Sequence, residues 1–110
     1  YANQVKMEQL GVSASILSEF GAVSEPCIRA MAEGARKVLG TTYSLATSGI
    51  AGPTGGTEEK PVGTVWIALA HENGVITRKL TLGGNRMQNI YLSSLACVNL
   101  LRKYLLNDLT

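Results

Sequence analysis

The feature that most constrains this chain is a glycine-rich segment that lies between two apolar runs. Residues 48–63 read Ser-Gly-Ile-Ala-Gly-Pro-Thr-Gly-Gly-Thr-Glu-Glu-Lys-Pro-Val-Gly. Glycine lacks a Cβ atom and permits positive φ, so this backbone can turn tightly and bring its N–H groups close to a ligand. A concave group of backbone N–H groups favours an anion. The segment therefore predicts a ligand-binding loop, and a long flexible hairpin connection is the alternative interpretation.

Two phosphate-binding motifs do not describe this segment. It contains no Gly-Lys-Ser or Gly-Lys-Thr sequence, which excludes a P-loop, and a strand follows it rather than the helix of a dinucleotide-binding fingerprint. The apolar runs at residues 43–47 and 64–71 predict the strands before and after the loop. We expect the first of them to be a parallel strand whose carboxyl end directs the loop into a ligand cleft shared with Arg86.

Turn and cap signals predict the remaining elements. Asn73-Gly74 is typical of a type I′ turn and predicts a hairpin with a return strand at residues 75–82. Capping residues predict four helices, at residues 4–10, 14–20, 25–39 and 86–106. The expected N-caps of these helices, in chain order, are Asn3, Ser13, Ser24 and Asn85.

The stretch from Ser48 to Ala70 resembles the signature of the CinA C-terminal domain family, the nicotinamide-nucleotide amidases. Members read closely as Thr/Ser-Gly-Ile-Ala-Gly-Pro-x-Gly-Gly-Thr-x-x-Lys-Pro-Val-Gly-Thr-Val, and this chain matches that pattern with Ser48 in the first position. The resemblance spans essentially the whole chain. Further matches are Tyr1-Ala2-Asn3 with Lys6, Leu10-Gly11-Val12, Gly21-Ala22-Val23-Ser24 and Gly84-Asn85-Arg86.

The resemblance implies an α/β fold, a three-layer α/β/α arrangement with a mixed, mostly parallel sheet and one antiparallel hairpin. It implies a single domain over residues 1–110 that is incomplete at its N-terminus. Family members open with a strand, a helix that carries Ala-Glu-Ser-Cys-Thr-Gly-Gly, and a second strand, whereas this sequence begins at the Tyr that follows them. We therefore expect the 110 residues alone to be inactive.

The implied activity is hydrolysis of nicotinamide mononucleotide to nicotinate mononucleotide and ammonia, a step of pyridine nucleotide salvage, without a cofactor or a metal. The alternative is a non-catalytic nucleotide-binding or dimerisation module of a CinA-like competence/damage-inducible protein. The Glu-Ser-Cys-Thr segment of the full polypeptide distinguishes the two. Its presence favours the enzyme, and replacement of its Ser favours the module.

Arg86 is the first candidate for binding the substrate phosphate. It follows Gly83-Gly84-Asn85 at a predicted helix N-terminus, where exposed N–H groups favour anions. Its guanidinium adds a bidentate donor. Taken alone, an arginine at a helix start is more often solvated, but the resemblance places an arginine here in family members.

The resemblance also implies roles for residues outside the predicted helix start. Tyr1 and Lys6 match active-site positions, and a lysine can act as a base when burial lowers its pKa. Ser48 retains the hydroxyl of the usual Thr. Thr57, Glu58 and Lys60 are interpreted only as shaping the loop. The expected ligand or oxyanion donors are the loop amides at Gly49, Gly52, Gly55 and Gly56.

Composition excludes several other classes of function. Nucleic-acid binding is disfavoured, because the net charge is only +2, Lys and Arg do not cluster, and aromatic residues make up 5% of the chain. No apolar run approaches the ~20 residues that span a membrane. Cys27 and Cys97 fit neither a metal spacing nor a disulfide framework, and His71 is the only histidine, so we expect reduced thiols, no metal site and a cytoplasmic protein. The apolar C-terminal helix predicts a homo-oligomer.

Overall fold

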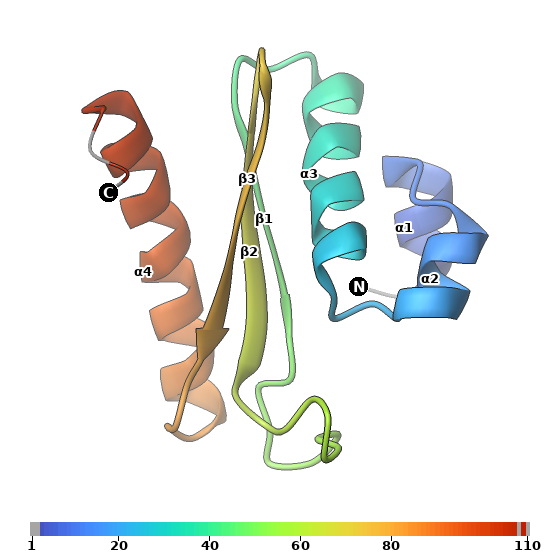
Figure 1. Ribbon diagram of the computed structural model, residues 1–110, viewed down its shortest axis with the longest axis vertical. Helices are drawn as coiled ribbons and strands as arrows, with labels where there is room; N and C mark the ends of the chain where they lie inside the picture. Colours follow the sequence, from blue (N-terminus) through green and yellow to red (C-terminus); the bar gives the residue numbers. More distant parts are fainter. Residues whose placement is uncertain (1–2, 108, 110) are drawn as a thin grey trace.

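Three antiparallel strands form a sheet that has helices on both faces (Figure 1). The computed structural model describes residues 3–107 and residue 109. Helix α4 lies against one face of the sheet, and α3 lies against the other, with α1 and α2 outside α3 (Figure 1). The elements, in chain order, are α1 (Asn3–Leu10), α2 (Ala14–Phe20), α3 (Glu25–Leu39), β1 (Ser44–Gly49), β2 (Thr64–His71), β3 (Gly74–Thr81) and α4 (Arg86–Leu105).

The strands form an antiparallel meander in the order β1-β2-β3. Ser44 lies opposite Ala70, and Gly49 lies opposite Val65, so β1 runs antiparallel to β2. The prediction of a parallel strand at residues 43–47 is therefore wrong, and the described strands do not form a mixed, mostly parallel sheet. The physical reason is connectivity: β1 pairs directly with the next strand through a loop, and a parallel pair would need a crossover connection.

Residues at the helix ends form the caps that the sequence predicts. The side chains of Ser13 and Ser24 accept hydrogen bonds from Ile16 N–H and Cys27 N–H, which starts α2 and α3. Gly40 ends α3 in the left-handed conformation. Asn85 caps α4 and forms a reciprocal capping box with Gln88. The exception is Asn3, which lies inside α1 rather than before it.

The turn between β2 and β3 differs from the prediction. His71 pairs with Gly74, so Glu72 and Asn73 are the two residues of the turn. Neither has positive φ, which a type I′ turn requires. The predicted hairpin is therefore confirmed, but the type I′ turn expected at Asn73-Gly74 is wrong. The Asn73 N–H instead donates to His71 Nδ1 at 3.2 Å, a side-chain bond that the Asn-Gly signal does not include.

Alternate residues of β2 build two hydrophobic clusters, one on each face of the sheet. Ala68 and Ala70 face the α3 side, where Cys27, Ile28 and Met31 are buried. On the α4 side, the buried residues are Val65, Ile67, Leu69, Cys97 and Leu100. This alternation follows from the two-residue period of a strand. The central strand therefore fixes α3 and α4 on opposite faces, with Trp66 packed against the α3-side cluster as predicted.

Helix α4 buries two polar residues and exposes much of its apolar surface. Its buried residues are Asn89, Ser93, Cys97 and Leu100. The exposed apolar residues are Met87, Ile90, Tyr91, Leu92, Leu95, Val98 and Leu105. An exposed apolar face of this kind is typical of a contact surface. Among the described residues, no helix combines the length and the hydropathy needed to cross a bilayer.

Candidate functional site

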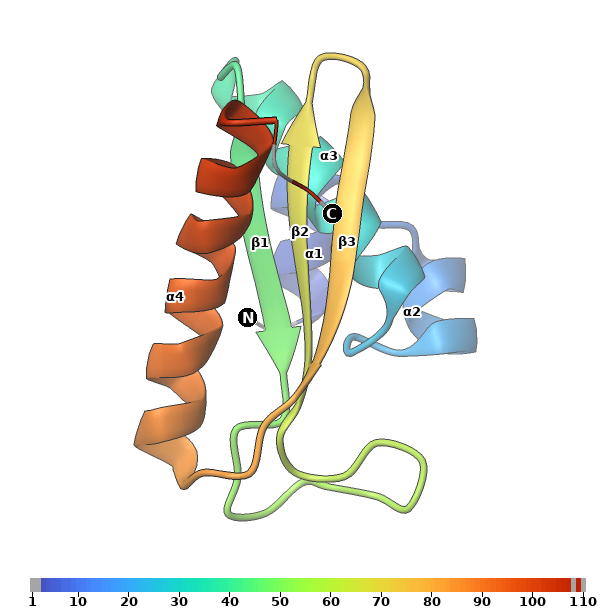
Figure 2. The same ribbon diagram turned by 60° about the vertical axis from the view of Figure 1, so that its left-hand side comes forward.

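The glycine-rich loop, residues 50–63, leaves the sheet at the carboxyl end of β1 and returns at the start of β2 (Figure 2). Three backbone hydrogen bonds close its base. The Ile50 N–H donates to Thr64 O at 2.9 Å, the Gly63 N–H donates to Ile50 O at 2.7 Å, and the Leu82 N–H donates to Gly63 O at 2.9 Å. The loop is therefore a hairpin connection with a fixed base, joined to the segment that leads from β3 to α4.

The predicted glycines serve two purposes in this loop. Gly52 and Gly55 have φ values of 91° and 94°, in the left-handed region that favours glycine. Gly49 and Gly56 instead sit where a Cβ would collide with neighbouring chain, at 2.6 Å from Val65 Cγ2 and from the Val62 nitrogen, respectively. The loop thus has the conformation that the glycine pattern predicts, with the backbone both turned and closely packed.

The loop has backbone N–H groups with no partner among the residues that the structure describes. Residues 51, 52, 54, 55 and 56 each have an N–H, and none of these donates a hydrogen bond; Pro53 has no N–H. The Thr57 N–H and the Lys60 N–H, beyond this stretch, do have acceptors. Exposed backbone N–H groups of this kind can donate to water or to an anionic ligand.

Arg86 reaches this loop from the first turn of α4. Its Nη1 donates to the Gly52 carbonyl oxygen at 3.0 Å. The predicted convergence of Arg86 with the Gly49–Gly56 backbone is therefore confirmed. A guanidinium has five N–H donors, so the bond to Gly52 leaves donors for a ligand. A hollow of about 490 Å³ lies at this junction, lined by Ala51, Pro53, Val62, Gly84, Asn85, Arg86 and Met87.

Asn89 makes a second link between α4 and the loop. Its Nδ2 donates to Ala51 O at 3.0 Å, and its Oδ1 accepts from the Gly84 N–H at 3.1 Å. The residue is only 1% exposed. One buried amide therefore joins the glycine loop to the turn before α4. Beside it, a smaller hollow of about 160 Å³ extends between β1 and α4, with Thr47 and Ser93 among its lining residues.

Ser48 and Lys60 attach the loop to the other side of the sheet. The Ser48 hydroxyl donates to Ala22 O at 3.0 Å, in the turn between α2 and α3. Lys60 Nζ donates to the carbonyl of Phe20, the last residue of α2, at 2.7 Å. Because the Ser48 proton is engaged, its oxygen can act toward a ligand only as an acceptor in this arrangement.

Lys6 is buried in α1, with 3% of its surface exposed. Burial raises the pKa of the Cys27 thiol, and the positive charges of Lys6 and Lys60 act in the opposite direction. Both ammonium groups therefore lie close enough to the start of α3 to affect the same thiol. The structure places Lys6 with Lys60 and Ser48 on the α3 side, while Arg86 lies on the α4 side. Tyr1 lies outside the described residues.

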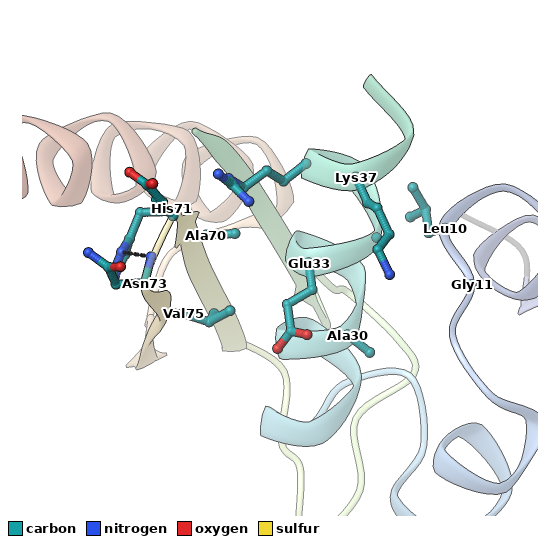
Figure 3. A pocket seen from close by; sticks show the side chains of 13 residues that line it. Leu10, Gly11, Ala30, Glu33, Lys37, Ala70, His71, Asn73 and Val75 are labelled. Carbon is teal, nitrogen blue, oxygen red and sulfur yellow. Dashed lines mark hydrogen bonds between the residues drawn. The ribbon is translucent and has the colours of Figure 1, made fainter. Parts of the chain in front are cut away.

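A hollow larger than the one at Arg86 lies elsewhere. It has a volume of about 590 Å³ and lies between α3 and the β2–β3 turn, lined in part by Glu33, Lys37, His71 and Asn73 (Figure 3). The β2–β3 turn is at the opposite end of the sheet from the glycine loop (Figure 1). We place the candidate site at the loop because unpaired N–H groups and Arg86 converge there. Among the described residues, no group of three His, Cys, Asp or Glu could hold a metal ion.

Comparison with known proteins shows which family this chain belongs to. The family model described as the CinA C-terminal domain matches residues 1–105. The chain belongs to the CinA C-terminal domain family. It is 50% identical over 105 residues to a CinA-like protein of Cytophaga hutchinsonii, which covers 96% of this chain and 25% of that protein. The chain thus spans about a quarter of the length of such curated relatives.

Solved structures of CinA proteins share the fold. The competence damage-inducible protein A of Klebsiella pneumoniae matches with a TM-score of 0.91 and 30% identity, over 96% of this chain and 65% of that chain. A competence/damage inducible protein of Agrobacterium tumefaciens matches with a TM-score of 0.89 and 36% identity, over 92% of this chain and 62% of that chain. Identity at this level extends the family assignment from sequence to the three-dimensional fold.

Two residues of the site lie beyond what we predicted from the sequence. Asn89 carried one usable signal: it is a polar residue four positions after the capping Asn85, in a helix rich in apolar residues. Lys60 was interpreted as shaping the loop, and the structure gives it a defined acceptor on α2. No pattern in the sequence identifies that acceptor, because the lysine and Phe20 are 40 positions apart.

Proposed function

We propose that this protein is an amidohydrolase that converts nicotinamide mononucleotide to nicotinate mononucleotide and ammonia. The observation that carries the proposal is the bond from Arg86 to the Gly52 carbonyl, which joins a helix N-terminus to a loop with unpaired N–H groups. A phosphate suits this junction because backbone N–H groups, the helix dipole and a guanidinium all favour an anion. The family resemblance of residues 48–70 supplies the choice of substrate.

In this proposal the two sides of the loop have different tasks. Arg86 and part of the loop bind the phosphate. Lys6 acts as a base that takes a proton from the attacking hydroxyl, the Ser of the Glu-Ser-Cys-Thr segment of the full polypeptide. Loop N–H groups stabilise the oxyanion that forms when the carboxamide carbon is attacked. The C–N bond then breaks, and the nitrogen takes the proton from Lys6 and leaves as ammonia. Water hydrolyses the ester left on the attacking hydroxyl, which frees that hydroxyl and supplies the second oxygen of the carboxylate. Ser48, with its proton bound to Ala22, accepts a hydrogen bond from the substrate.

The proposal predicts that the two cations affect different kinetic constants. We expect Arg86→Ala to raise KM much more than it lowers kcat, because a phosphate contact is made in both the ground state and the transition state. Lys6→Ala should lower kcat about 10²- to 10⁴-fold, the usual contribution of a general base. Arg102→Ala is a matched control, since Arg102 is an arginine of the same helix that binds Asn99 near its other end.

These variants should be measured with nicotinamide mononucleotide and the full-length protein, by ammonia release. The reverse pattern, with kcat lost in Arg86→Ala and KM raised in Lys6→Ala, would show that the role assignment is wrong. Equal behaviour of Arg86→Ala and Arg102→Ala would show that the guanidinium at the loop does not bind the phosphate.

The exposed face of α4 favours a further proposal, that the protein is a homo-oligomer. Met87 and Tyr91 are 81% and 64% exposed on this face. Apolar side chains that gather on one helix face mark a contact surface more often than a solvated one. Self-association is also the activity of the alternative candidate, the non-catalytic dimerisation module, so kinetic measurements are needed to separate the two functions.

A further inference from the structure

Three side-chain hydrogen bonds attach the glycine loop to helices on opposite faces of the sheet. On the α4 side, Arg86 and Asn89 bind the carbonyls of Gly52 and Ala51. On the α2 side, Lys60 binds the carbonyl of Phe20. The loop thus crosses the lower end of the sheet from one helical layer toward the other, with its tip on the side of α3 and α2 (Figure 1). The unpaired N–H groups of residues 51–56 lie in the chain between these attachments.

A turn between Thr57 and Lys60 and the C-terminal end of α2 form the contact at the loop tip. Thr57 and Lys60 bind one another: the Thr57 N–H donates to Lys60 O at 2.9 Å, and the Lys60 N–H donates to Thr57 Oγ1 at 3.0 Å. This turn fixes the backbone from which the lysine extends. Phe20 ends α2, where carbonyl groups lack helical partners and a lysine is a favourable donor.

Gly21 provides the space for this contact. It has a φ of 80°, and a Cβ at this position would lie 3.2 Å from Lys60 Nζ. Any larger side chain would therefore crowd the ammonium group as well as strain the backbone. Two separate segments, the α2 C-terminus and the loop tip, are thus both shaped around one lysine.

We infer that Lys60 is a positioning residue that holds the tip of the glycine loop on α2 and so keeps the loop N–H groups in their binding arrangement. Lys60 itself needs no contact with the substrate. Releasing the tip leaves the loop held only at its base and by α4, and the binding-competent population falls. Apparent affinity falls by the same factor, because a ligand binds only the competent fraction.

The direct test is amide hydrogen exchange, measured by NMR without ligand on the full-length protein. We expect Lys60→Met to accelerate exchange of the residue-57 N–H, which donates to the residue-60 carbonyl at 2.9 Å, about three- to tenfold, the effect of losing one partly exposed hydrogen bond. Lys60→Arg, which can still donate to Phe20 O, should restore slow exchange. Lys79→Met is the matched control, because it removes the same charge from an exposed position on β3.

The ligand arm of the test rests on the proposed function. Lys60→Met should raise KM for nicotinamide mononucleotide by the factor by which the binding-competent fraction of the loop falls, and leave kcat within about twofold. Unchanged exchange in Lys60→Met, or equal exchange in Lys60→Met and Lys60→Arg, would overturn the inference. If Lys60→Met accelerates exchange and the unsubstituted protein neither binds nor hydrolyses the mononucleotide, the positioning role of Lys60 is supported and the proposed function is contradicted.

A second variant keeps the test decisive if Lys60→Met fails to fold. Thr57→Val removes the hydroxyl that fixes the backbone of Lys60 and changes the side-chain volume little. It should accelerate exchange of the same residue-57 N–H, by a smaller factor than Lys60→Met. Exchange equal to that of the unsubstituted protein would again contradict the inference.

Discussion

Replacing Asn89 with alanine tests the link between α4 and the glycine loop. The side chain is 1% exposed and makes two hydrogen bonds, to Ala51 O at 3.0 Å and from the Gly84 N–H at 3.1 Å. Alanine removes both bonds and leaves a backbone donor and a backbone acceptor without their partners. The loop would then be held to α4 by Arg86 alone.

The expected loss of stability follows from these bonds. Each net hydrogen bond contributes about 0.5–1.5 kcal/mol, and a buried group left without a partner costs about 1–3 kcal/mol. Alanine is the better helix former by at most about 0.7 kcal/mol, which offsets part of the loss. We therefore expect Asn89→Ala to lower the free energy of unfolding by about 2–4 kcal/mol.

The assay is urea unfolding followed by circular dichroism, with Asn99→Ala as the control. Asn99 lies on the same helix, is exposed, and binds only Arg102 among the interactions recorded for it. Its replacement should change the free energy of unfolding by no more than about 0.5 kcal/mol, as is usual at an exposed site. If Asn89→Ala and Asn99→Ala lose equal stability, the argument for a buried amide link is refuted.

Three further predictions concern other parts of the molecule. Gly34→Ala should separate α1 from α3 and expose Lys6, because a Cβ at Gly34 would overlap the Leu10 carbonyl oxygen; unchanged Lys6 labelling by a lysine reagent would contradict this. Burial raises the pKa of Cys97 to about 11, from a usual value of 9.0, so the stability that it contributes is complete below pH 9 and is lost as the pH rises toward 11. The stability difference between the unsubstituted protein and Cys97→Ala should fall by about 1 kcal/mol between pH 8 and pH 10, and a constant difference in urea unfolding would count against this burial effect. Finally, light scattering at micromolar concentration should give a dimer or larger assembly that Val98→Lys disrupts, and a monomer would refute self-association through the exposed α4 face.

Local signals in the sequence predicted the elements well. The bounds Ala14–Phe20 and Thr64–His71 agree with the predicted ranges, because a capping serine with a terminal glycine, and a glycine followed by a continuous apolar run, are local signals. The direction of the strands could not be predicted from local signals. The antiparallel pairing of β1 with β2 depends on which strands meet across the loop, and the short apolar run at residues 43–47 carries no information about it.

The candidate site was predictable only where a motif marks it. The glycine pattern anticipated positive φ at Gly52 and Gly55, and the helix start anticipated Arg86. The Arg86–Gly52, Asn89–Ala51 and Lys60–Phe20 bonds join residues 34, 38 and 40 positions apart, so they follow from the tertiary fold rather than from spacing. The sequence therefore indicates part of the candidate site, Arg86 and the loop glycines, and the structure indicates which side chains hold the loop.

The most direct test of the proposed function is ammonia release by the full-length protein from two substrates that differ only in the phosphate. We expect turnover of nicotinamide mononucleotide and a large loss of kcat/KM with nicotinamide riboside. In Arg86→Ala the two substrates should have nearly equal kcat/KM, because the variant lacks the guanidinium that is the proposed phosphate contact. Equal kcat/KM for the two substrates would contradict phosphate binding at the loop, and no ammonia from either would contradict the amidohydrolase itself.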